Sequence, residues 1–483
     1  MSLRSKWLKQ PHKTQSRVFR KLISDASQTV FGRDHNFDQI NSYNDFKNQV
    51  PIRDYEGLRP YLERAIQGEE DVCWKGKALY LSKTSGTTSG SKYIPISKES
   101  MPFHIRSAKH ALLSYIFETK NASFVDGKMI FLQGSPALEK KNGLDVGRLS
   151  GIVAHHVPNY LQRNRLPKMS TNLIEDWEEK VEKIAEETLL EDLRLISGIP
   201  SWVQMYFEKL LNASGKRTIK EIFPNFSLFV YGGVNYEPYR AKFESMIGES
   251  IPSIELYPAS EGFIAYQDSQ NQEGMLLEIN SGIFYEFIPL EELDSENPTR
   301  LSLEMVELNV NYAIVLNTNA GLWAYLIGDT VKFTSLSPYR IKVTGRTKHF
   351  TSAFGEHVIA EEVEEAVKLA CQISSSQINE FHVAPQTNPQ NELPYHEWFI
   401  EFGKMPTDIE AFKSILEQEM QRQNVYYKDL ITGNVLQPLK LSFVRKDGFV
   451  EFMKSQGKLG GQNKIPRLAN NRKYADEIAK FLA

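Results

Sequence analysis

The alternation of apolar and polar residues along the chain predicts helices in its first half. Apolar residues recur at helical spacing over residues 13–30, and this helical region is expected to end at residues 31–33, which include a glycine. A second, longer helix is expected after Ser170, with Gly198 and Pro200 as its stop. The side chains that share one face of this longer helix are Leu173, Trp177, Val181 and Ile184.

Continuous apolar runs predict strands. Residues 226–230 and 253–257 are short, apolar and followed by glycine or a turn, which is typical of buried strands. Residues 78–81 and 93–96 are predicted to form the two strands of a hairpin. Because such strands are mixed with helices along the chain, the pattern favours an α/β fold.

The pattern changes near Gly345. The elements predicted after it are a helix at 361–370, a strand at 398–402, a helix that begins at the capping box 407–410, and a terminal helix after Asn470. These elements can form a small α/β layer of their own. We therefore predict a large domain over residues 1–345 and a small one over residues 346–483.

Composition narrows the class of protein. The chain has 483 residues, which exceeds the usual size of a single core, so two or more domains are expected. A net charge of -3 argues against nucleic acid as the main partner. Cys73 and Cys371 lie too far apart in sequence to indicate a metal or disulfide framework. No apolar run approaches the length of a membrane span and residues 1–7 lack the apolar core of a signal peptide, so we expect a cytoplasmic location.

The most informative segment runs from Leu81 to Lys92, between the two strands of the predicted hairpin. It is rich in small and hydroxylated residues, and its two glycines let the backbone turn tightly and approach a ligand. Backbone N–H groups, hydroxyls and the ammonium of Lys92 together suit a polyphosphate. The spacing Gly-x-x-x-Gly-x-Lys differs from that of a Walker loop, which runs into a helix. On these residues alone, a flexible polar turn is an equal alternative.

Acidic residues follow two of the predicted strands. Glu261 lies in a turn directly after the strand at 253–257, and strand ends in α/β sheets present ligands. A carboxylate there can hold Mg²⁺, which prefers one or two carboxylates plus phosphate oxygens. Asp329 ends the run 326–329, where it can accept sugar hydroxyls. The alternatives are an exposed turn glutamate and a β-turn aspartate without a ligand.

Two further motifs can contribute to a ligand site. Tyr231 with Gly232 and Gly233 offers an aromatic ring and bare backbone, a platform for an adenine, or else a buried strand with a glycine turn. Cationic glycine loops occur at residues 345–348 and 460–467, although such loops are usually solvated connectors.

The order and spacing of these motifs resemble those of the adenylate-forming superfamily. Within it, the chain is most similar to the acyl-acid amido synthetases of the Gretchen Hagen type, and the likeness covers nearly the whole chain. The segments that carry it are residues 29–35, 50–55, 85–92, 94–96 and 462–467.

The resemblance implies both a fold and a reaction. A large N-terminal α/β domain of packed β-sheets and helices (1–345) would bind ATP and the acyl acid, and a small mobile C-terminal α/β domain (346–483) would rotate over it. ATP and a carboxylic acid first give an acyl-adenylate and pyrophosphate, and the amine of an amino acid then gives an amide and AMP. The expected cofactors are ATP and Mg²⁺. The expected partners are the small acid and the amino acid, without nucleic acid or membrane, and the chain is expected to be a monomer or a weak homodimer.

The resemblance also assigns roles to individual residues. The residues expected to contact the nucleotide are Ser85, Gly86, Thr87, Thr88, Tyr231, Gly232, Gly233, Tyr257, Ser260, Asp329 and Arg346. Glu261 is expected to bind Mg²⁺, and Lys92 and Lys464 are expected to be catalytic. Rotation of the C-terminal domain would bring Lys464 to the phosphates, where it would stabilise the transition state of adenylation.

The acyl pocket is less well marked. Candidates are the segment 153–158 and the helix around Phe103 and His104, although an ordinary structural role is favoured for His155 and His156. Indole acetate, a benzoate, a jasmonate and a fatty acid all stay open as the acid, and the amine is equally open.

Two other functions stay open alongside the amido synthetase. One is an acyl-CoA-type ligase with a thiol acceptor, which nucleotide motifs cannot distinguish from an amide-forming enzyme. The other is a catalytically silent nucleotide-binding homologue. The joint presence of Lys92, Glu261, Asp329 and Lys464 argues against the silent homologue, because such a protein has no chemical reason to keep all four.

Overall fold

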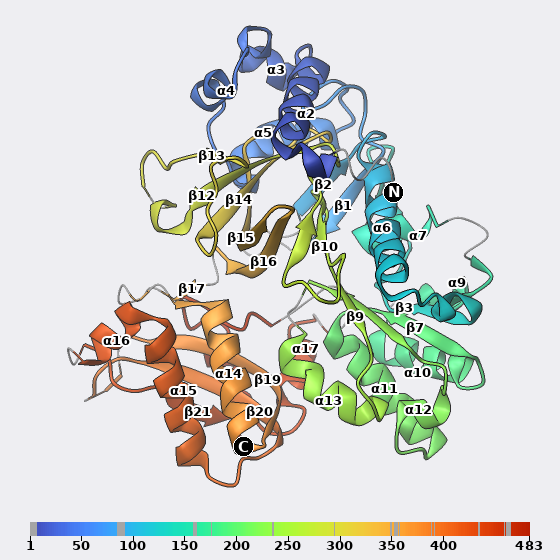
Figure 1. Ribbon diagram of the computed structural model, residues 1–483, viewed down its shortest axis with the longest axis vertical. Coiled ribbons are helices and arrows are strands. Elements are labelled where there is room, and N and C mark those ends of the chain that lie inside the picture. Colours follow the sequence, from blue (N-terminus) through green and yellow to red (C-terminus); the bar gives the residue numbers. More distant parts are fainter. Residues whose placement is uncertain are drawn as a thin grey trace. The chain divides into compact units, whose positions relative to one another are not determined.

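The chain folds into two compact units, which a computed structural model describes (Figure 1). The described residues are 7–84, 92–157, 162–174, 176–233, 236–293, 295–347, 350–351, 356, 358–387, 389–390, 392–432, 435–457, 459 and 465–483. Unit 1 comprises Met1–Val234 and Ser250–Val343, and unit 2 comprises Asn235–Glu249 and Thr344–Ala483. The later division lies close to the predicted boundary after residue 345. Helix α13 (Glu237–Ile247) groups with unit 2, although it lies within the predicted first domain, residues 1–345.

A mixed sheet of 12 strands runs through the described part of unit 1. Its parallel part is β6 (Arg165–Leu166), β3 (Lys128–Phe131), β7 (Leu193–Ser197), β8 (Leu228–Gly232) and β9 (Ser253–Ala259), in that order. The sheet continues through β10 (Gly262–Tyr266), β11 (Met275–Leu277), β16 (Tyr339–Arg346), β15 (Tyr325–Leu336), β14 (Asn311–Thr318), β12 (Ile283–Pro289) and β13 (Leu301–Ser302). The parallel strand β8 is buried along Leu228, Phe229 and Val230, as its continuous apolar run predicts.

A smaller sheet carries the predicted hairpin. Its order is β2 (Lys92–Ile96), β1 (Tyr80–Thr84), β5 (Leu144–Gly147) and β4 (Glu139–Lys141). Strands β1 and β2 are antiparallel, and Thr84 lies opposite Lys92 at the open end of the pair. The hairpin is therefore confirmed, and residues 85–91, which connect its strands, lie outside the described residues.

Helices of unit 1 precede and follow these strands (Figure 1). They include α2 (Pro11–Ala26), α3 (Val30–Asp34), α4 (Tyr43–Gln49), α5 (Tyr55–Ile66), α6 (Met101–Thr119), α7 (Leu149–Ala154), α9 (Met169–Asn172), α10 (Trp177–Thr188), α11 (Pro200–Ser214) and α12 (Ile219–Ile222).

Two helix predictions need correction. The helix expected over residues 13–30 ends at Ala26, because Thr29 begins a new helix by accepting a hydrogen bond from Gly32 N through its side chain. The single long helix expected from Ser170 to Gly198 is instead the short helix α9, which ends before Leu173, and the helix α10, and residues 193–197 form the buried strand β7. An apolar run of that length fits a helix or a parallel strand equally well, and the neighbouring strands decided the outcome.

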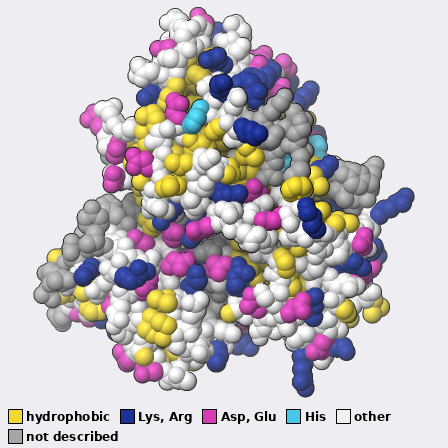
Figure 2. All heavy atoms as spheres, viewed as in Figure 1, with side chains coloured by type: hydrophobic (Ala, Val, Ile, Leu, Met, Phe, Trp, Pro, Cys, Tyr) yellow, Lys and Arg dark blue, Asp and Glu magenta, His cyan; other side chains and the backbone are white. Residues whose placement is uncertain are grey.

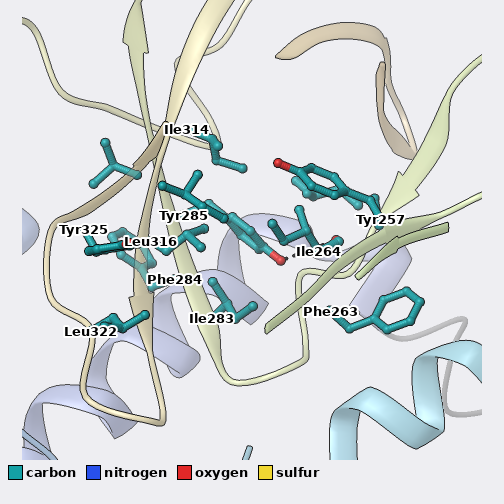
Figure 3. Close-up of a cluster of buried hydrophobic side chains, with 14 of the residues drawn as sticks. Tyr257, Phe263, Ile264, Ile283, Phe284, Tyr285, Ile314, Leu316, Leu322 and Tyr325 are labelled. Atoms are coloured by element: carbon teal, nitrogen blue, oxygen red, sulfur yellow. Dashed lines mark hydrogen bonds between the residues drawn. The ribbon is translucent and has the colours of Figure 1, made fainter. Parts of the chain in front are cut away.

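The core of unit 1 joins strands that are distant in sequence. Figure 3 shows Tyr257 of β9, Tyr285 of β12 and Tyr325 of β15 within one cluster of buried apolar side chains. Close packing of these side chains fixes the relative positions of β9 and β15.

Unit 2 is a small α/β layer, as the sequence predicted. Its sheet has the order β19 (Gln377–Gln386), β20 (Tyr395–Lys404) and β21 (Lys440–Phe443), and a two-stranded ribbon joins β17 (Phe350–Thr351) to β18 (Val358–Ile359). Its helices are α13, α14 (Ala360–Ser374), α15 (Ile409–Gln423), α16 (Val425–Thr432), α17 (Gly448–Ser455) and α18 (Ala475–Ile478). Asp408, and not Thr407, caps α15 by accepting from Ala411 N.

Candidate functional site

The carboxyl end of β8 approaches its neighbour closely. A Cβ on Gly232 would lie 2.5 Å from the carbonyl oxygen of Leu256 in β9, so only glycine fits at this position. Gly233 has a φ of 76°, a left-handed backbone that glycine adopts without strain. The ring of Tyr231 is buried and stacks on Phe229 with 5.5 Å between centroids. This strand end therefore offers a ligand its backbone more than its aromatic ring.

Glu261 is held at the tip of the β9–β10 hairpin. Ala259 and Gly262 pair directly, so that Ser260 and Glu261 form the connecting turn. The hydroxyl of Tyr325, whose ring is 1% exposed, donates to Glu261 Oε1 at 3.3 Å. A buried tyrosine thus fixes the direction of an acidic side chain at a strand end.

Tyr325 is fixed in turn by an early segment of the chain. Arg53 N donates to Ala324 O at 3.0 Å, and Leu326 N donates to Arg53 O at 2.9 Å. This parallel bridge between Arg53 and Tyr325 gives the segment 50–55 a structural role beside the site.

Asp329 protrudes from an irregularity in β15. Ala313 of β14 pairs with Thr330, but Val315 pairs with Leu326, so β15 has extra residues opposite its neighbour. Such bulges redirect side chains and are common beside active sites. The hydroxyl of Tyr257 donates to Asp329 Oδ2 at 2.6 Å, which joins β9 to β15.

The strand that leads into the segment 85–91 is tied to the same turn. The Ser82 hydroxyl, which is fully buried in β1, lies 2.8 Å from the Ser260 hydroxyl. On the opposite strand, the Lys92 ammonium lies 5.4 Å from the ring centroid of Tyr55, a cation–π distance. Tyr55 is itself held by Tyr93 N, which donates to its hydroxyl oxygen at 3.0 Å.

Several predicted site residues are thus neighbours in unit 1. The structure brings together Tyr257, Ser260, Glu261 and Asp329 through the contacts above. Ser85, Gly86, Thr87, Thr88 and Lys464 lie outside the described residues, and Arg346, at the end of β16, belongs to unit 2.

Sequence reasoning missed Ser82 and Tyr325. Each contacts a predicted site residue from another strand, and the contact cannot be inferred from local sequence. The available indication was position, since Ser82 is the second residue of the segment 81–92 and Tyr325 stands just before the run that ends at Asp329.

The residues present fit Mg²⁺ only if a bound nucleotide supplies part of its coordination. Among the described residues, no group of three or more His, Cys, Asp or Glu side chains could hold a metal ion. Glu261 supplies one oriented carboxylate, and a nucleotide would have to supply the remaining oxygens.

Two of the candidate histidines of the acyl pocket, His155 and His156, have hydrogen-bond partners, and the third, His104, is buried. His155 Nε2 donates to Pro136 O at 2.9 Å, and His156 Nε2 lies 3.0 Å from the Tyr80 hydroxyl. Burial, followed by the neighbouring His155, lowers the pKa of His156. His104 is 3% exposed, and its burial lowers its pKa to about 4, so the ring is neutral at pH 7.

Sequence models of one protein family match most of the chain. The GH3 family N-terminal domain matches residues 5–168 and 164–252, the central domain residues 276–346, and the C-terminal domain residues 361–473. The chain belongs to the GH3 family. The predicted Gretchen Hagen membership is therefore confirmed.

Relatives and solved structures agree with this assignment. Jasmonoyl-L-amino acid synthetase JAR4 of Nicotiana attenuata is 25% identical over 66% of this chain and 66% of the relative, just under two thirds of its length. Indole-3-acetic acid-amido synthetase GH3.3 of Arabidopsis thaliana is 21% identical over 94% of this chain and 88% of the relative. The solved GH3.15 acyl acid amido synthetase matches with a TM-score of 0.80 at 17% identity, over 100% of this chain and 97% of that one. The predicted fold, a large α/β domain with a smaller C-terminal one, is confirmed.

Proposed function

We propose that this GH3 protein is an ATP-dependent acid–amino acid ligase. In the first half-reaction a carboxylate oxygen of the acid bonds to the α-phosphorus of ATP, and pyrophosphate leaves. In the second, the amine nitrogen of an amino acid bonds to the acyl carbon, AMP leaves, and the nitrogen loses a proton. The observation that carries this proposal is the convergence of Glu261 and Asp329, each oriented by a tyrosine from another strand.

Asp329 is proposed to accept the ribose hydroxyls. A carboxylate accepts hydrogen bonds from two adjacent hydroxyls, and charge-assisted bonds of this kind are strong. Its hydrogen bond from Tyr257 supports the role, because it keeps the carboxylate oriented before the nucleotide binds. Tyr257, Ser260, Tyr231 and the glycines after it are proposed to line the nucleotide site.

Glu261 and the phosphate loop are proposed to bind the metal and the phosphates. Mg²⁺ would be shared between the Glu261 carboxylate and phosphate oxygens, and would neutralise charge on the triphosphate. Lys92 supports the phosphate assignment as a cation at the base of the loop, opposite Thr84. Ser85, Gly86, Thr87 and Thr88 are proposed to supply the remaining donors.

Arg346 and Lys464 are proposed to act from the C-terminal part of the chain. Arg346 would contact the ribose or phosphates near the hinge, and Lys464 would stabilise charge that develops during adenylation. The protein is proposed to act in the cytoplasm as a monomer or weak homodimer. Within the part of the chain that the structure describes, no helix is long and apolar enough to cross a membrane.

The acceptor is proposed to be an amino acid amine. The names of the GH3 relatives support an amino acid as acceptor and acids such as jasmonic and indole-3-acetic acid as donors. Which acid this protein uses is the question that a screen of carboxylic acids addresses. On the face drawn in Figure 2, acidic and basic side chains are interspersed, which favours small substrates over nucleic acid.

A screen of carboxylic acids tests the proposal. Pyrophosphate release would be measured with ATP, Mg²⁺ and indole-3-acetate, jasmonate, 4-substituted benzoates or fatty acids, and repeated with amino acids and then with CoA. We expect one acid class to support release and an amino acid to raise AMP turnover. If CoA supported turnover and no amine did, the protein would be a thiol ligase. If no acid supported release while ATP still bound, it would be a silent homologue.

A further inference from the structure

The chain just after Lys464 is attached to strand β19 of unit 2. His382 Nδ1 donates to Pro466 O at 2.5 Å, and Val383 N donates to Arg467 O at 2.8 Å. Ala469 N in turn donates to Val383 O at 2.9 Å. Residues 466–469 therefore run beside β19, where Leu468 forms an isolated parallel bridge with Val383, and Pro466 follows Lys464 by two residues.

The side chain of Arg467 reinforces this attachment. Its guanidinium Nη1 lies 2.8 Å from Glu364 Oε1 of α14, and its Nε lies 3.7 Å from Glu380 Oε1 of β19. It also stands over the ring of Phe381 at 5.1 Å. The side chain of Arg467 is 7% exposed. Removing one partner of a buried ion pair leaves an uncompensated charge and strongly destabilises the folded state.

His382 directs a polar atom from a buried position to this segment. Its ring is fully buried in β19, with the rings of Phe399 and Tyr474 at 6.2 and 6.1 Å between centroids. Because a carbonyl oxygen only accepts, Nδ1 must carry the proton in the bond to Pro466. An apolar side chain would fill such a site without this donor, so the histidine is better explained by the bond than by packing.

We propose that His382 and Arg467 are positioning residues for Lys464. A lysine side chain carries its ammonium on a flexible four-carbon stem. Whether the ammonium reaches a phosphate therefore depends on where the lysine backbone is held. Lys464 precedes this attached segment by two residues in the sequence, and a chain of two residues has a short reach, so the attachment at Pro466 and Arg467 limits how far Lys464 can lie from β19. The inference rests on the proposed function of Lys464 and extends it to residues that never touch the nucleotide.

Paired substitutions of His382 test the hydrogen bond. His382→Leu removes the donor, whereas His382→Asn keeps a donor near the position of Nδ1. With the acid identified by the screen, we expect His382→Leu to slow acid-dependent pyrophosphate release about tenfold to a hundredfold. His382→Asn should recover most of this rate. Aminolysis of a preformed acyl-adenylate should change less than threefold in both variants, about the level of an indirect effect.

Arginine substitutions provide a matched control. Arg467→Lys should slow the adenylation step, because a lysine cannot hold Glu364 and Glu380 with the geometry of a guanidinium. Arg472 lies in the same unit and pairs with Glu397 at 2.8 Å and Asp476 at 2.9 Å. Arg472→Lys should leave both half-reactions within about twofold of the wild type, because these two partners of Arg472 lie outside the segment 466–469 and outside β19. Hydrogen exchange at the amides of Val383 and Ala469 reports the attachment without any substrate, and should accelerate in His382→Leu.

A double substitution separates positioning from general damage. If His382 acts through Lys464, then His382→Leu should cost nothing further in a Lys464→Ala background. Losses that simply add would overturn the positioning role, as would unchanged hydrogen exchange and adenylation in His382→Leu. Normal adenylation by Lys464→Ala would instead overturn the proposed role of Lys464, and the positioning role with it.

Discussion

At the scale of single residues, the site depends on two tyrosines that orient two carboxylates. Figure 3 shows Tyr257 and Tyr325 in the apolar core of unit 1. Their hydroxyls donate to Asp329 and Glu261, respectively. Aromatic rings fixed by packing hold a polar tip with little loss of entropy. The acidic groups are therefore oriented in advance, which lowers the cost of binding a nucleotide.

The ribose assignment predicts a defined loss of affinity. Asp329→Ala should weaken ATP binding by about 1.5–3 kcal/mol, since hydrogen bonds to a charged group are lost. Tyr257→Phe should have a smaller effect, because the carboxylate remains and only its orientation relaxes. Calorimetry with ATP and Mg²⁺ measures both. Unchanged affinity in Asp329→Ala would refute the ribose assignment.

The metal assignment predicts a change in Mg²⁺ dependence. Tyr325→Phe removes the hydroxyl that donates to Glu261. It should raise the Mg²⁺ concentration needed for half-maximal pyrophosphate release about tenfold, which corresponds to the free energy of one hydrogen bond to a charged group. Tyr285→Phe is the matched control, because Tyr285 lies in the same cluster and its hydroxyl is directed to the carbonyls of Ile264 and Glu278. Equal Mg²⁺ requirements in the two variants would contradict the role of Tyr325.

At the scale of elements, the site is built where a parallel strand pair meets a hairpin and an irregular strand. The close approach of β8 and β9 requires glycine at position 232, and the extra residues in β15 direct Asp329 toward β9. Neither feature depends on a single side chain. Both depend on how backbones are spaced within one sheet.

A glycine substitution tests this spacing. Gly232→Ala would place a methyl group 2.5 Å from Leu256 O, so it should destabilise unit 1 by about 1–3 kcal/mol and weaken ATP binding. Gly215→Ala is a useful contrast, because its Cβ meets open space and only its left-handed backbone is unfavourable, at about 1 kcal/mol. Thermal unfolding and ATP titration would show the difference. Normal ATP binding by a folded Gly232→Ala variant would refute the role of this strand end.

At the scale of the whole molecule, adenylation and amide formation are expected to require different arrangements of the chain. Lys464→Ala should lower acid-dependent pyrophosphate release by about two to three powers of ten, the usual loss for one donor at developing charge. Aminolysis of a preformed acyl-adenylate should suffer much less. Measuring the half-reactions separately decides the matter. Equal losses would mean that Lys464 is structural, or that both steps occur in one arrangement.

The sequence by itself determined the family and most of the candidate chemistry. Short segments carry these features, because a turn between strands, a glycine at a strand end and a lysine in a loop are each local in the chain. For the same reason the hairpin, the strands β8 and β9 and the α/β layer of unit 2 could be predicted from local periodicity.

Only the tertiary structure decided how these pieces are oriented. Residues 193–197 became a strand because parallel neighbours on both sides provide its hydrogen bonds, which the apolar run alone cannot reveal. Tyr325 and Ser82 acquire their roles from partners 64 and 178 residues away. His382 likewise meets Pro466 across 84 residues. Contacts of this kind depend on the register of whole strands, and register is a property of the packed sheet, not of any one segment.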